Sequence, residues 1–137
     1  MDKLVAYVDG SYSKSKEMYS YGIVFIDSGK VVKKISKKGS NKEAAKMHQI
    51  YGELKGAMDA IDYAIENNYN QITIFYDYKG IEKWAKGEWK RNKKYTKKYY
   101  DFIQEKSNSI NINFIKVKAH SNNKFNDMAD SLARRAL

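Results

Sequence analysis

The chain has 137 residues, of which 42% are hydrophobic and 14% aromatic, so we expect a folded core rather than disorder. It contains no cysteine and only two histidines, which excludes a disulfide framework and thiolate metal sites and argues against a histidine-rich zinc site. The formal net charge of +10 suggests a polyanionic partner, nucleic acid above all, or an anionic membrane surface; a solvated lysine-rich surface is the alternative.

The N-terminus enters a strand-like run at once and shows no export signal. No apolar stretch approaches the roughly 18 residues that span a bilayer. We therefore expect a soluble, cytoplasmic protein that does not act on a membrane. Proline, internal repeats and low-complexity tails are absent, so we expect one domain over residues 1–137, and we expect it to be a monomer.

The first part of the chain predicts three antiparallel strands. Residues 3–8, 21–26 and 31–35 have β character, and residues 27–30 form a good hairpin turn. Apolar residues then recur at spacings of three and four from about Glu43 to Glu66. That spacing predicts one continuous amphipathic helix.

The second part of the chain alternates between strand and helix. Residues 71–76 predict a further strand, two helical stretches are expected between 79 and 106, residues 111–117 predict a fifth strand, and residues 123–137 predict a final helix. The order βββαβααβα contains a strand–helix–strand crossover. It predicts an α/β fold with a five-stranded mixed sheet and helices packed on it.

Three carboxylates stand where such a fold binds ligands. Asp9 and Asp77 each follow a predicted strand, and parallel neighbouring strands would bring both to one edge of the sheet. Aspartate is also a common turn residue, so each one alone has a structural alternative. Glu53 lies about 90° from the centre of its helix's apolar face, at the border of that face.

The final helix offers two more aspartates. On a helical wheel Asp127 lies opposite the apolar face, whereas Asp130 lies closer to the sheet and is the better ligand. Asp9, Glu53, Asp77 and Asp130 would repel one another at one edge unless cations lay between them. Oxygen ligands suit Mg²⁺ or Mn²⁺, and paired ions are a recurring device for phosphodiester cleavage.

Five short segments carry a family resemblance. They are 7–11 (YVDGS), 52–55 (GELK), 75–79 (FYDYK), 117–120 (VKAH) and 126–130 (NDMAD). In this order the chain resembles the type 1 ribonuclease H family over nearly its whole length. The resemblance implies a ribonuclease H-like fold and an endonuclease that hydrolyses the RNA strand of RNA–DNA hybrids. It also implies products with 5′-phosphate and 3′-hydroxyl ends.

The resemblance also implies roles for individual residues. Asp9, Glu53, Asp77 and Asp130 would bind two Mg²⁺ ions, with Mn²⁺ as a substitute. Asp9 would bridge both ions, Asp130 would help to hold the ion that activates water, and the other two would hold the ion at the leaving 3′-oxygen. His120, in the loop after the fifth strand, would assist proton transfer or product release.

Further residues are implied in substrate binding. Gly10 and Ser11 follow the first aspartate, and Asn126 falls where the family often has an asparagine near the substrate. Many relatives carry an Asn-Asn pair before the helix glutamate, and here those positions are Gln49 and Ile50. Gln49 would replace one amide in the minor groove. The glutamate itself is placed to sense the 2′-hydroxyl that separates RNA from DNA.

Residues 83–98, called the basic segment below, contain eight basic residues and one acid. The segment resembles the basic protrusion with which some relatives hold the DNA strand. The chain starts at the catalytic strand, so we expect no separate hybrid-binding domain and assign this grip to Trp89, Lys93 and Lys94, with Trp84 packed inward. A solvated helix is the alternative. Phosphate contacts carry no sequence code, so cleavage should be largely sequence-independent.

Three other functions remain open. A related DNA nuclease of the same fold, as in transposase and resolvase relatives, is the nearest. A hybrid- or double-stranded-RNA-binding module is the second, although a binding protein has no need of four mutually repelling acids. A purely structural interaction protein would explain neither the acids nor the basic segment.

Overall fold

A computed structural model describes residues 2–118 and 123–137. Its five strands form one sheet in the spatial order β3-β2-β1-β4-β5. β1 pairs antiparallel with β2, which pairs antiparallel with β3, whereas β1, β4 and β5 run parallel. The strands are β1 (Lys3–Ser13), β2 (Met18–Asp27), β3 (Lys30–Gly39), β4 (Gln71–Tyr76) and β5 (Asn111–Lys116). The predicted α/β fold with a five-stranded mixed sheet is confirmed.

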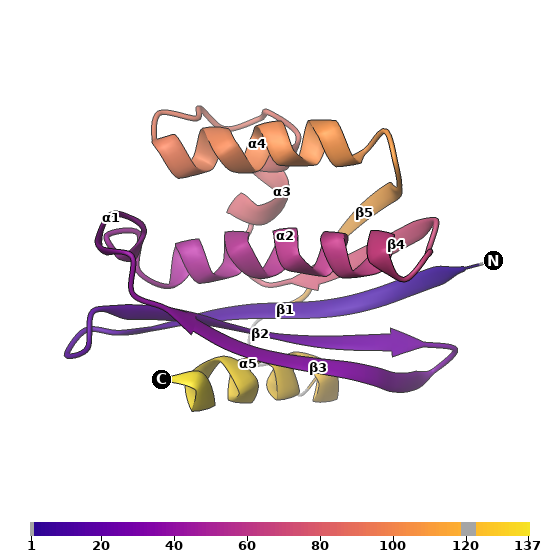
Figure 1. Cartoon of the computed structure of the whole chain (residues 1–137), viewed down its shortest axis with the longest axis horizontal. Coiled ribbons are helices and arrows are strands. Elements are labelled where there is room, and N and C mark those ends of the chain that lie inside the picture. Colours follow the sequence, from indigo (N-terminus) through magenta and orange to yellow (C-terminus); the bar gives the residue numbers. More distant parts are fainter. Residues whose placement is uncertain (1, 119–122) are drawn as a thin grey trace.

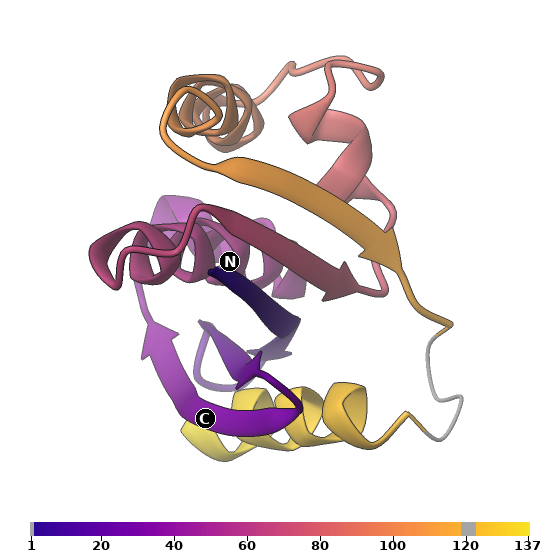
Figure 2. The same cartoon turned by 90° about the vertical axis from the view of Figure 1, so that its right-hand side faces the viewer.

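Helices cover both faces of this sheet (Figure 1 and Figure 2). They are α1 (Lys42–Ala45), α2 (Gln49–Glu66), α3 (Gly80–Ala85), α4 (Lys94–Lys106) and α5 (Lys124–Ala136). Alternate residues of β1 point to opposite faces, so Leu4 and Ala6 pack in the main core with α2, whereas Val5 and Tyr7 pack with α5. No helix in the described part of the chain is long and apolar enough to cross a membrane.

The helix predicted over about 43–66 is interrupted, and in this respect the prediction was wrong. α1 and α2 are separated by a turn at His48, whose φ of 58° lies in the left-handed region. Met47 and Ile50 nevertheless both pack against the core. The apolar spacing therefore continues across the break, and periodicity alone does not reveal it.

β1 is longer than predicted. It continues to Ser13, so Asp9 lies inside the strand, opposite Gly22 of β2, and not after the strand's end. The pairing of β1 with β4, however, ends at Tyr7 and Phe75. Asp9 thus lies beyond the last residue of β1 that pairs with β4. With respect to β4, Asp9 therefore has the expected position at the edge of the sheet.

Candidate active site

Asp9 and Asp77 emerge together where β1 and β4 part. Tyr7 pairs with Phe75 in the parallel ladder, and each aspartate comes two residues later in its own chain segment. Parallel strands present their carboxyl ends at the same edge of a sheet. The two strands are parallel neighbours, which is the condition under which both aspartates were expected at one edge, and Asp9 is only 7% exposed.

Glu53 reaches this edge from α2 and is 6% exposed, deeper than the helical wheel predicts. The reason is a close approach between α2 and the sheet. A Cβ on Gly10 would lie 2.5 Å from the carbonyl oxygen of Gln49, and a Cβ on Gly52 would lie 2.1 Å from that of Ser20. Any larger residue at either glycine would push α2, and Glu53 with it, away from the strands.

Asp9, Glu53 and Asp77, called the acidic trio below, form a compact set of oxygen donors. One carboxylate oxygen of each lies within 4.8 Å of the other two. Gly10 donates its backbone N–H to Asp9 Oδ1 at 2.9 Å. Glu53 Oε2 is buried and receives a hydrogen bond from none of the described residues. A buried carboxylate oxygen normally has a partner, so the trio could hold a divalent cation.

The pKa values at the trio respond to this crowding. Burial is the largest cause that raises the pKa of Asp9, and the charges of Asp77 and Asp130 raise it further, to about 7. Burial also raises the pKa of Glu53 well above its ordinary value, followed by the charges of Asp77 and Asp9. Carboxylates held together out of water are unfavourable as anions unless a cation lies between them. The electrostatics of this edge therefore favour a bound cation.

α5 brings Asp130 to the trio from the other face of the sheet. The charge of Asp130 and a side-chain hydrogen bond between it and Asp9 are among the causes that raise the pKa of Asp9. Asp130 also forms an ion pair with Arg134, with Nη2 2.9 Å from Oδ2. Asp127 is exposed in the first turn of α5, as the helical wheel predicts. Asn126 is 3% exposed, and no described residue donates to its Oδ1.

Comparison with known proteins identifies the family. The family model described as RNase H matches residues 1–137. The chain belongs to the ribonuclease H family of hydrolases. The ribonuclease H of Ruthia magnifica subsp. Calyptogena magnifica is 32% identical over 149 residues, which cover 100% of this chain and 97% of that protein. The ribonuclease H of Caldicellulosiruptor saccharolyticus is 29% identical, over 98% and 95% of the two chains.

Solved structures agree on the fold. The RNase H1 of the halophilic archaeon Halobacterium salinarum superposes with a TM-score of 0.82 at 19% identity, over 98% of this chain and 96% of that one. LC11-RNase H1, solved in complex with an RNA/DNA hybrid, gives 0.75 at 14% identity, over 97% and 98%. The ribonuclease H-like fold that the five sequence segments imply is confirmed.

The positions that depart from the family's Asn-Asn pair differ in burial. Gln49, the first residue of α2, is exposed, whereas Ile50 is partly buried and packs against the core. Ser11 is half-buried in β1. Only Gln49 of the two thus offers a polar group at the surface beside the trio. His120, the predicted proton-transfer residue, lies outside the described residues.

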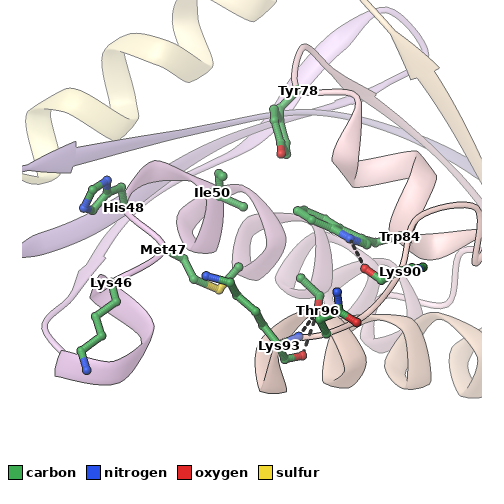
Figure 3. A pocket seen from close by; sticks show the side chains of 10 residues that line it. Lys46, Met47, His48, Ile50, Tyr78, Trp84, Lys90, Lys93 and Thr96 are labelled. Carbon is green, nitrogen blue, oxygen red and sulfur yellow. Dashed lines mark hydrogen bonds between the residues drawn. The ribbon is translucent and has the colours of Figure 1, made fainter.

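A cavity of about 400 Å³ lies between the α1–α2 turn and the basic segment (Figure 3). Trp84 donates its indole N–H to the carbonyl of Lys90 at 3.3 Å along this wall. Trp89 packs edge-on against Trp84, with ring centroids 5.2 Å apart, so part of its ring is already covered. The cavity is lined by Lys46, Met47, His48, Ile50, Tyr78, Trp84, Lys90, Asn92, Lys93 and Thr96.

Lys46 and His48 also line this cavity, although no pattern in the sequence indicates it. Both fall inside the helix predicted over about 43–66, where a lysine and a histidine on a polar face indicate only solvent exposure. The turn at His48 redirects the chain so that both residues border this cavity, although the His48 ring itself packs on Tyr12, with ring centroids 4.5 Å apart. Lys94, a predicted substrate contact, lies 3.8 Å from Glu43, and both of these side chains are exposed.

Proposed function

We propose that this protein hydrolyses the RNA strand of RNA–DNA hybrids and leaves 5′-phosphate and 3′-hydroxyl ends. The observation that carries the proposal is the acidic trio, three buried or half-buried carboxylates within 4.8 Å of one another, in a chain of the ribonuclease H family. The RNA/DNA hybrid bound by LC11-RNase H1, which shares the fold, supports the choice of substrate.

The donor set fits Mg²⁺, with Mn²⁺ as a substitute, because every donor is a carboxylate oxygen. The trio would hold one ion, and Asp9 with Asp130 would hold a second. The unpartnered Oε2 of Glu53 and the raised pKa of Asp9 both support a cation at this edge. Paired ions of this kind supply charge stabilisation to the attacking and leaving oxygens of a phosphodiester.

The side chains around the trio would orient the scissile phosphate. Asp9 is the residue shared by both sets of carboxylates, which supports its assignment as the bridging ligand. Glu53 would read the neighbouring 2′-hydroxyl with a carboxylate oxygen and so discriminate RNA from DNA. Asn126 would contribute a hydrogen bond near the substrate, and His120 would carry a proton or help to release the product.

The basic segment would hold the hybrid by its phosphates. Lys93 lines the cavity and Lys94 is exposed at the start of α4, both within reach of a backbone that passes the α1–α2 turn. Trp89 would add a contact within the basic segment, and Gly10, Ser11 and Gln49 would add contacts beside the trio. Such contacts position a duplex without reading its sequence, so cleavage should be largely sequence-independent.

All four proposed ligands come from one chain, which supports a monomer as the acting unit, and we place the reaction in the cytoplasm. A gel of labelled hybrid, incubated with Mg²⁺ or with EDTA, tests the proposal. We expect the RNA strand to be cut only with Mg²⁺, while duplex DNA of the same sequence stays intact. Cleavage of the DNA duplex would favour a DNA nuclease of this fold. Hybrid binding without cleavage in either Mg²⁺ or Mn²⁺ would show a binding module.

A further inference from the structure

Asp130 has one negatively charged neighbour, Asp9, and one positively charged neighbour, Arg134. On one side it is close enough to Asp9 for its charge and a shared hydrogen bond to act on that carboxyl. On the other side Arg134, one helical turn later on α5, places Nη2 2.9 Å from Asp130 Oδ2. The guanidinium is two-thirds exposed and the carboxylate 30% exposed. Asp130 therefore lies between the acidic trio and the positive charge of Arg134.

The carboxylates of this edge thus form two unequal places for a cation. The acidic trio is assembled, with its oxygens within 4.8 Å of one another, and no Lys or Arg among the described residues forms an ion pair with Asp9 or Glu53. Asp130 is not part of that set. Its carboxylate is engaged by Arg134, so a cation between Asp9 and Asp130 meets a competing positive charge.

We propose that Arg134 is a positioning residue that weakens the ion site between Asp9 and Asp130, so that the two ions bind in sequence. The first ion binds at the acidic trio, and the second binds only when the ion pair between Arg134 and Asp130 breaks. This inference rests on the proposed function, because it assumes that the carboxylates bind two cations. It concerns the difference in affinity between the two sites, which neither the fold nor the family assignment specifies.

The exposure of the pair sets the size of the effect. Water and salt screen an ion pair whose guanidinium is two-thirds exposed. Arg134 therefore competes with the second cation but does not exclude it. An exposed pair spaced by four residues on a helix contributes little to stability, so removing it should change the second affinity by about 2- to 5-fold.

A purely structural role for Arg134 predicts something different. Arg134 and Arg135 both lie in the last turn of α5, where either positive charge is favourable to the helix dipole. Arg135 is exposed and forms no ion pair with any described residue. Arg135→Gln is thus a matched control that removes the same charge from the same turn and leaves Asp130 with its partner.

The experiment is a Mn²⁺ titration of the full chain without nucleic acid, with free Mn²⁺ followed by electron paramagnetic resonance. We expect two classes of site in the wild type. Arg134→Gln should tighten only the weaker class, by about 2- to 5-fold, whereas Arg134→Lys and Arg135→Gln should stay close to the wild type. Asp130→Asn should remove the weaker class, and circular dichroism melts confirm that each variant folds.

The outcomes separate this inference from the proposed function. A weaker class that is unchanged or weakened in Arg134→Gln would overturn the role of Arg134, as would an equal change in Arg135→Gln. If the wild type bound both Mn²⁺ ions with the same affinity, that result would overturn the role of Arg134 as well, while leaving the proposed function intact. A wild-type chain that binds no Mn²⁺ in this titration would overturn both.

Discussion

The acidic edge, which consists of the acidic trio and Asp130, and the basic segment place charge in opposite ways. At the acidic edge, like charges are crowded together at least half-buried, and they come from β1, α2, the end of β4 and α5. In the basic segment the charges follow one another along the chain, and most of them are exposed. Several are balanced locally there: Lys83 pairs with Glu88 at 2.8 Å and Lys97 with Asp101 at 3.2 Å.

This difference shows how each region depends on single residues. Burial and mutual repulsion raise the pKa of Asp9 and Glu53, so each carboxylate there is held in an unfavourable state that a cation relieves. Exposed charges are screened and replaceable, because water and salt compete with every contact. One substitution at the acidic edge should therefore abolish RNA cleavage. Substitutions in the basic segment should instead weaken hybrid binding gradually.

The largest effect is expected at the acidic trio. Asp9→Asn or Asp77→Asn should reduce RNA cleavage below detection, because an amide cannot replace an ionised ligand. Hybrid binding should remain measurable. Asp101→Asn, which removes an exposed acid from α4, is the control and should cleave like the wild type. A substantial rate for Asp9→Asn in Mg²⁺ would show that the trio is not the metal site.

The two aspartates of α5 should separate sharply. Asp130 is partly buried beside Asp9, whereas Asp127 is exposed one turn earlier. Asp130→Asn should lower turnover by about 100-fold or more, as expected for a lost ligand in a two-ion site, and Asp127→Asn should change it little. The measurement is turnover at saturating hybrid. Equal losses in both variants would mean that neither residue is distinguished by its place on the helix.

His120 should matter less than the carboxylates. In a site where metal ions supply the nucleophile and the charge stabilisation, a histidine can only assist with protons or product release. His120→Ala should slow turnover by about 10- to 1,000-fold, at or below the range for a lost general acid–base group. Hybrid affinity should stay nearly unchanged. Unaltered turnover from roughly pH 6 to pH 9 would remove the residue from the mechanism, since proton transfer by histidine is pH-dependent.

The acidic edge was largely predictable from the sequence because its residues sit on regular elements. Strand runs place Asp9 and Asp77 just beyond the residues that pair between β1 and β4, although β1 continues past Asp9. A helical wheel ranks Asp130 above Asp127 correctly for burial. The depth of Glu53 was not predictable in this way. It depends on how closely α2 approaches Gly10, a contact between distant parts of the chain that no local pattern encodes.

The surroundings of the basic segment were harder to predict. The cavity beside it exists because the chain turns at His48 in a left-handed conformation, where the apolar spacing gave no sign of a break. Trp89, predicted to contact nucleic acid, also packs edge-on against Trp84 and Tyr78, which the sequence did not indicate. Side chains in irregular segments take positions that tertiary packing decides.

A gradual loss is expected in the basic segment. Replacing Lys93 and Lys94 together by alanine should weaken hybrid binding several-fold for every sequence alike and leave turnover at saturation almost unchanged. Each lost phosphate contact should reduce the slope of log affinity against log salt by about 0.9. Binding titrations at several salt concentrations measure both quantities. The double variant Lys83→Ala with Lys97→Ala is the control, because these lysines lie 2.8 and 3.2 Å from their acid partners, closer than the 3.8 Å between Lys94 and Glu43.

The smallest expected effect concerns stability without metal. The pKa of Asp9 is raised to about 7 in the folded chain from 3.8, so between these values the folded state binds the proton that the unfolded state has lost. The contribution of Asp9 to the free energy of unfolding therefore falls as pH rises through this window. In EDTA, the melting temperature of the wild type should fall by a few degrees relative to that of Asp9→Asn as the pH rises from about 5 to about 8. Lys93→Ala, which alters only an exposed charge, should differ from the wild type in melting temperature by the same amount at every pH.

Mg²⁺ added at the upper pH should raise the melting temperature of the wild type more than that of Asp9→Asn, because a ligand stabilises only a fold that binds it. A gap between Asp9→Asn and the wild type that does not change with pH would show that repulsion at the acidic edge is already relieved without a cation.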